Sequence, residues 1–190
     1  MGANMMLTIG SIVLFGIFLS SANRLVIGNN QIASQNEYYI AGLALAQSII
    51  DEAKTKAFDE QTVTQAATSR SALTAPGSLG RDGAGEAVPL PDTLTSVSPY
   101  SPTNKGYYSA LKFDDIDDYN GYSRLANTAR AEGYLLSVSV SYASETYPDS
   151  AVSAKTYCKT MAVKVTSPFF PKKTDSDAPD TLTVSYTFTY

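Results

Sequence analysis

The sequence predicts an α+β fold, in which a long N-terminal α-helix packs against an antiparallel β-sheet head at the C-terminal end. Two observations carry this prediction. The first is the helical spacing of apolar residues, with no proline before Pro76. The second is the alternation of apolar and polar residues in three late segments, which is typical of half-buried strands. We therefore expect a helix over residues 1–58, a loop-rich region over residues 59–133 and a β-meander over residues 134–190.

Residues 1–24 form the apolar half of the predicted helix. No charged side chain precedes Arg24, and a helix of about 20 apolar residues can cross a bilayer. A removed signal peptide would show basic residues before the apolar run and a small-residue cleavage site after it, and neither occurs here. A retained membrane helix is therefore favoured. The side chains expected to pack in a bilayer, or against copies of the same segment, are Met5, Met6, Leu7, Ile9, Ile12, Val13, Leu14, Phe15, Ile17, Phe18 and Leu19.

Residues 25–58 form the amphipathic half of the helix. Charged residues such as Asp51 and Glu52 share one face. The helix also contains Gly28 and Gly42, which are either tolerated or allow a neighbouring element to pack closely. Apolar residues on the other face recur mostly at helical spacing, at Ile32, Tyr39, Leu43, Ala46, Ile50, Ala53, Ala57 and Phe58.

The three segments with strand alternation are residues 134–142, 156–166 and 181–190. Serine and threonine fill one face of the first and last segments, so we expect that face in water and the other against the helix. The apolar faces carry Leu136, Val138, Val140 and Tyr142 in the first segment, and Leu182, Val184, Tyr186, Phe188 and Tyr190 in the last.

The composition excludes several classes of function. The chain has 14 basic and 18 acidic side chains and a net charge of -4, which argues against nucleic acid as a partner. It has no histidine, and its single Cys158 can form neither an internal disulfide nor a cysteine-based metal site. A glycine-rich phosphate loop and a serine nucleophile motif are also lacking. We therefore expect no enzyme activity, and no cofactor apart from the cation considered next.

One short stretch is dense in oxygen ligands, and two interpretations of it stay open. Ca²⁺ binds about six to eight oxygens, so a calcium site is one interpretation. The other is a turn in which aspartate side chains cap backbone N–H groups. The residues concerned are Asp114, Asp115, Asp117, Asp118 and Asn120.

The whole organisation resembles that of the type IV pilin and pseudopilin family. Residues 44–53, with the sequence ALAQSIIDEA, look like the lower helix of minor pilins and pseudopilins. Residues 113–121, FDDIDDYNG, are similar to an Asp-Asp-Tyr-x-Gly loop found in some pilin-like proteins. The resemblance implies a pilin-like fold and a subunit that assembles through its N-terminal helix.

Two family features take a different form here. A prepilin carries a short basic leader that ends in glycine, so either Gly2 is the cleavage position or the chain is already the mature form. The family favours glutamate at the fifth mature position, and the residue at that position here is Met5 or Leu7. Helix packing alone is then expected to set the register between subunits.

The function that the resemblance implies is a structural subunit of an extracellular type IV pilus-like filament on the cell surface, with a precursor in the inner membrane. The implied partners are copies of the same chain, the membrane before assembly and the inner-membrane pilus assembly machinery. Two alternatives stay open. One is a minor pilin or pseudopilin of a secretion or DNA-uptake machine, and the other is a single-pass membrane-anchored binding protein.

Overall fold

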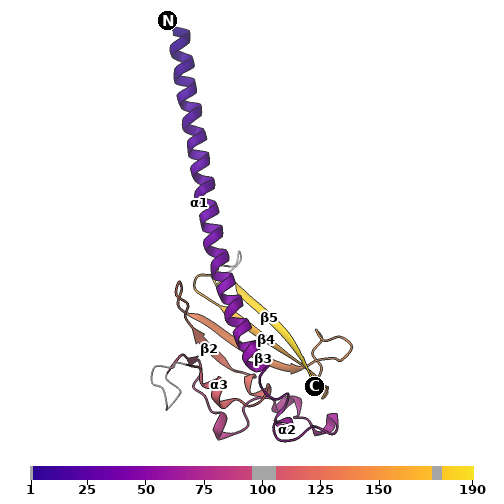
Figure 1. Ribbon diagram of the computed structural model, residues 1–190. Coiled ribbons are helices and arrows are strands. Elements are labelled where there is room, and N and C mark those ends of the chain that lie inside the picture. Colours follow the sequence, from indigo (N-terminus) through magenta and orange to yellow (C-terminus); the bar gives the residue numbers. More distant parts are fainter. Residues whose placement is uncertain (1, 96–105, 173–176) are drawn as a thin grey trace. The chain divides into compact units, whose positions relative to one another are not determined.

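The computed structural model describes residues 2–95, 106–172 and 177–190 (Figure 1). The chain divides into two compact units, Met1–Tyr38 and Tyr39–Tyr190. We call the second unit the head. Helix α1 (Gly2–Ala53) supplies the described residues of the first unit and the opening residues of the head. The predicted α+β class is confirmed, because the head combines the last turns of α1 with a five-stranded sheet.

The sheet has the strand order β1-β2-β3-β4-β5. Strands β3 (Tyr134–Tyr142), β4 (Cys158–Thr166) and β5 (Thr181–Thr189) form the antiparallel meander that the alternation predicts. Two short strands extend it: β2 (Ser123–Ala126) is antiparallel to β3, and β1 (Asp92–Thr93) is parallel to β2. These two strands are too short for any alternation to be visible in the sequence.

The pairing register aligns the apolar side chains of the three long strands on one face. Leu136 lies opposite Val165, and Val138 lies opposite Val163, and all four of these side chains are buried. The apolar face of the edge strand β5 is more exposed to solvent, since Tyr186 is 40% exposed. The sheet is therefore half-buried, as its serine- and threonine-rich opposite face requires.

The end of α1 covers the apolar face of the sheet (Figure 1). Leu43 was expected on the packed face but is 47% exposed, because it lies about 100° around the helix from Gly42. Ile32, which lies in the first unit, is also exposed. The buried residues of the helix are Gly42, Ala46, Ile49, Ile50 and Ala53.

Helix α1 ends at Ala53, whereas the spacing suggested that it continues to residue 58. The reason is a competing backbone interaction. The Ala57 N–H donates to Asp114 O at 2.9 Å, and Ile116 N–H donates back to Ala57 O at 3.0 Å. Ala57 therefore joins a bridge to the middle of the chain instead of another helical turn.

The described residues between α1 and β2 form only short elements. Helices α2 (Glu60–Val63) and α3 (Tyr108–Lys112) are separated by irregular chain, and Asp59 caps α2 by accepting a hydrogen bond from Gln61 N at 3.1 Å. Single 3₁₀ turns occupy Arg70–Ala72, Pro76–Ser78, Ala84–Glu86 and Asp117–Tyr119. The part of the loop-rich region that falls on residues 96–105 lies outside the described residues, as do residues 173–176 of the meander.

Gly42 is needed for the close approach of α1 to the sheet. A Cβ at this position would lie 2.9 Å from Phe170 Cζ, so the Phe170 ring would have to shift, and its stacking on Tyr39 with 4.5 Å between ring centroids opposes this. We expect Gly42→Ala to destabilise the head by about 1–3 kcal/mol through overpacking. Thermal unfolding followed by circular dichroism measures this. Gly28→Ala is the control, since a Cβ there meets nothing within 4 Å, and it should leave the melting temperature of the head unchanged.

Candidate functional site

The first half of α1 has a mainly apolar surface without a charged side chain before Arg24. The side chains expected to pack in a bilayer or filament are all exposed in the first unit, from 51% for Leu19 to 79% for Met6. They surround the helix rather than forming one stripe. We call residues 2–24 the apolar segment. The set consists of Met5, Met6, Leu7, Ile9, Ile12, Val13, Leu14, Phe15, Ile17, Phe18 and Leu19.

Two hydroxyl side chains of the apolar segment, those of Thr8 and Ser11, bond to their own helix. The Thr8 hydroxyl donates to the carbonyls of Asn4 and Met5, both at 2.9 Å. The Ser11 hydroxyl donates to Leu7 O at 3.0 Å and to Thr8 O at 2.9 Å. Hydroxyls that bond within the helix can enter an apolar environment at low cost, because no donor is left unpaired. By length and composition, α1 is able to cross a membrane.

The aspartate-rich loop in the head divides its side chains among three sites. Asp117 pairs with Lys159, and the Asn120 side chain bonds to Val140 N and Leu79 O. Asp115 Oδ1 accepts a hydrogen bond from the backbone N–H of Asp118, within the same loop, at 3.0 Å. Of the five residues considered for calcium, Asp114 and Asp118 are the two that belong to a described group of three carboxylates able to hold a metal ion, and the third carboxylate is that of Glu86.

Glu86 links two groups of carboxylates. One oxygen each from Glu86, Asp114 and Asp118 lie within 4.8 Å of one another, and the same holds for Glu60, Asp82 and Glu86. We call these five residues the acidic cluster. Calcium binding stays a prediction, but the ligands available to it differ from the five considered above. Sequence spacing could not reveal Glu60, Asp82 or Glu86, since the fold alone brings them to the loop.

Burial and neighbouring carboxylates raise the pKa values of two aspartates in the acidic loop. Burial, reinforced by the charges of Asp117 and Asp118, raises the pKa of Asp115 to about 8. Burial raises the pKa of Asp118 to about 7, and nearby Glu86 adds to this effect. Both pKa values exceed the 3.8 of a free aspartate, so the folded head binds more protons than the unfolded chain between about pH 4 and pH 8.

The stability of the head is therefore expected to fall as the pH rises through this range. Asp115 and Asp118 contribute fully below about pH 4 and lose their contribution as the pH passes their folded pKa values. We expect the melting temperature in detergent and EDTA to be higher near pH 5 than near pH 8, by on the order of 5 °C. Asp115→Asn should flatten this dependence. A melting temperature that rises steadily from pH 5 to pH 8 would contradict the prediction.

A second cluster is fully buried beneath the loop. Lys159 Nζ lies 2.7 Å from Asp59 Oδ2 and 2.6 Å from Asp117 Oδ1, and none of the three side chains is more than 2% exposed. We call these three residues the buried ion cluster. Burial opposes the charged form of Asp59, yet Lys159 and Thr74 overcome it and hold the Asp59 pKa below its ordinary value. Burial raises the pKa of Asp117 to about 6, although Lys159 acts to lower it.

A third polar network fixes α1 within the head. Arg124 Nη2 donates to Glu52 Oε2 at 2.7 Å and to Ser109 Oγ at 2.8 Å. The guanidinium also lies 3.9 Å from the centroid of the Tyr107 ring. Burial opposes the charge on Arg124, but Glu52 outweighs this effect and the Arg124 pKa is raised. The network joins α1 to β2 and α3.

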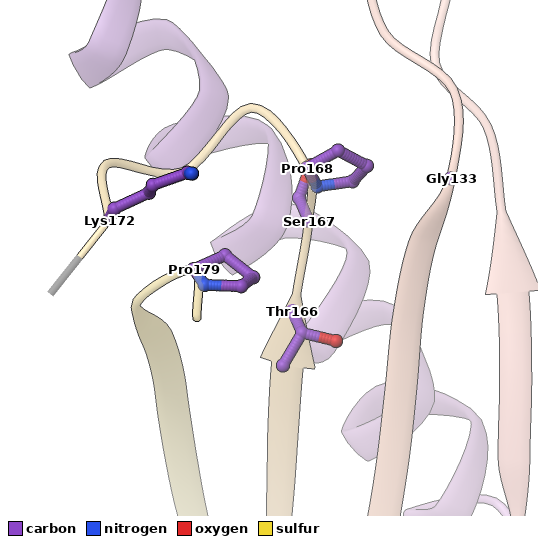
Figure 2. A pocket seen from close by; sticks show the side chains of 6 residues that line it. All are labelled: Gly133, Thr166, Ser167, Pro168, Lys172 and Pro179. Carbon is purple, nitrogen blue, oxygen red and sulfur yellow. The ribbon is translucent and has the colours of Figure 1, made fainter. Parts of the chain in front are cut away.

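A shallow cleft of about 380 Å³ opens at the end of the sheet where β4 finishes and β5 begins (Figure 2). Its described lining is mainly apolar, and Lys172, the charged residue among the described lining residues, is engaged with Asp177 at 2.9 Å. These described residues provide a shaped surface but no acid–base or nucleophilic pair for chemistry. Its lining consists of Gly133, Thr166, Ser167, Pro168, Lys172 and Pro179.

No protein-family model, curated protein or solved structure matches this chain. The candidate site is therefore defined by its own geometry. It consists of an apolar segment able to cross a membrane and a head stabilised by two buried charged networks.

Proposed function

We propose that this chain is a structural subunit of an extracellular type IV pilus-like filament and has a pilin-like fold. The observation that carries the proposal is the apolar segment, whose side chains are exposed all around the helix. Such a surface needs cover on every side. A bilayer supplies that cover before assembly, and copies of the same segment supply it in the filament.

Once the segment has left the bilayer, the neighbouring copies keep it from water, and this stabilises the polymer relative to separated subunits in water. Covering one Val, Leu, Ile, Phe or Met side chain contributes about 1.5–3 kcal/mol, so the whole set contributes on the order of 20 kcal/mol before the costs of ordering. A repeated contact that does not close into a ring produces an open helical filament. No covalent link between subunits is required.

The alternatives differ in abundance and in assembly. A minor pilin or pseudopilin would assemble in the same way but in few copies. A single-pass membrane-anchored binding protein would keep the apolar segment in lipid and use the head for a ligand. The cleft at the ends of β4 and β5 is the feature of the head that favours this second alternative.

The test is electron microscopy of material sheared from the cell surface, combined with N-terminal sequencing of its subunits. The proposal expects filaments in which this chain is the main component. The same sequencing identifies the mature N-terminus and so tests cleavage after Gly2. If the chain is absent from sheared fibres and is extracted by detergent only as a small particle, the proposal is wrong and the membrane-anchored alternative holds.

A further inference from the structure

The buried ion cluster holds a nucleophile against two carboxyl groups. Lys159 lies on β4, Asp117 on the 3₁₀ turn after α3, and Asp59 at the start of α2. The lysine nitrogen is within 2.7 Å of an oxygen of each acid, and all three side chains are shielded from solvent. Holding an amine and a carboxyl group at this distance raises their effective concentration for reaction with one another. We propose that Lys159 and Asp117 join through an intramolecular side-chain amide bond, with Asp59 moving the proton.

Asp117 rather than Asp59 is the group attacked, because the two carboxyls are held differently. Both oxygens of Asp59 accept hydrogen bonds, including those from Thr74 N at 3.0 Å and from the Tyr142 hydroxyl at 3.1 Å. Asp117 Oδ1 contacts Lys159, whereas its Oδ2 is buried and has no hydrogen-bond partner within the described residues. The Asp117 carboxyl can therefore rotate to present its carbon to Nζ.

The unpartnered oxygen also identifies the leaving group. A buried acceptor without a donor is unfavourable, and departure of this oxygen as water removes it. The amide that remains keeps one oxygen, which corresponds to the Oδ1 already facing Lys159.

The reaction balances without an outside reagent. Asp59 accepts a proton from Nζ and passes it to Asp117 Oδ2, which leaves a neutral amine beside a neutral carboxylic acid. The amine attacks the Asp117 side-chain carbon and a C–N bond forms. A second proton then moves from the nitrogen through Asp59 to the Oδ2 hydroxyl, and the C–O bond breaks as water leaves. One ammonium and one carboxylate thus become one secondary amide and one water, with no oxidation or reduction.

The surroundings favour condensation over the ion pair. The centroids of the Phe58 and Tyr142 rings lie 4.6 and 5.1 Å from the lysine nitrogen and help to exclude solvent. A water-poor environment disfavours separate charges and favours the neutral amine and acid that react. The bond would tie β4 to the aspartate-rich loop and does not depend on filament formation.

The test is peptide mapping of the purified, folded full-length chain after denaturation and tryptic digestion. The expected product is residues 113–124 joined to residues 156–164, at the summed mass less one water and with no cleavage after Lys159. If the native chain gives residues 113–124 and residues 156–159 as separate peptides at their sequence masses, with cleavage after Lys159, the proposal is wrong.

Variants identify the role of each group. Lys159→Met should give no linked peptide, and Asp59→Asn should abolish or strongly slow the linkage. Asp117→Asn should still link but lose ammonia in place of water. The control is Lys155→Met, since the Lys155 nitrogen contacts backbone carbonyls rather than carboxylates and its loss should leave the linkage intact. Full linkage in folded Asp59→Asn would overturn the assignment of Asp59.

Discussion

The Val13→Lys variant is expected to form no filaments, while its head keeps the wild-type melting temperature. Val13 lies in the middle of the apolar segment and is 55% exposed in the first unit, so it faces whatever covers that unit. A lysine at the centre of a membrane helix costs about 2.5–3.5 kcal/mol. Repeated in every subunit of a filament, the charges would also repel one another and remain unpaired. Phe15→Lys should have the same effect.

The measurement is the amount of filament in sheared surface material, alongside the amount of the chain in the membrane fraction. Val13→Leu is the matched control, because it keeps the segment apolar and should assemble normally. Val13→Asn serves as a variant that inserts more readily than the lysine variant but is still polar. Normal filaments made by a lysine variant that is present in the membrane would contradict the proposed role of the apolar segment.

The sequence predicts secondary structure correctly where a local repeat of apolar residues determines it. Residues 134–142 alternate without a break, and β3 occupies those positions with Leu136, Val138 and Val140 buried. The spacing of apolar residues likewise predicts helix α1. The turn predicted after Ala53 does not form, because Ala57 makes a bridge to Asp115 instead. That bridge depends on a residue far along the chain, and no local pattern contains it.

The sequence indicates part of the buried ion cluster but not all of it. Lys159 is in phase with Met161 and Val163 on β4, and a charged residue on the apolar face of a strand indicates a buried partner. The identity of that partner cannot be read from the sequence, because Asp59 and Asp117 arrive from two separate turns. The other members of the acidic cluster, Glu60, Asp82 and Glu86, give no comparable signal, since single acidic residues in loops are common.

Arg124→Met is expected to cause one of the largest losses of head stability, about 3–5 kcal/mol, which is the usual cost of breaking a buried ion pair. The side chains of Arg124 and Glu52 are 4% and 16% exposed and lie 2.7 Å apart. The substitution leaves the Glu52 carboxylate without its cation and removes the Arg124 Nε donor at 2.9 Å from the Tyr122 hydroxyl oxygen. For a head of this size the loss corresponds to a drop in melting temperature on the order of 10 °C.

A second ion pair in the head provides a control of the same length. Arg70 Nη2 lies 2.7 Å from Glu145 Oε2, but these side chains are 55% and 36% exposed. Exposed pairs contribute about 0–1 kcal/mol, so Arg70→Met should change the melting temperature little. Combining Glu52→Gln with Arg124→Met removes the unpaired charge and should cost less than the two single losses together. If Arg70→Met and Arg124→Met destabilise equally, burial is not what makes the Glu52–Arg124 pair important, and the attachment of α1 to the head must depend on packing around Ala46, Ile50 and Ala53 instead.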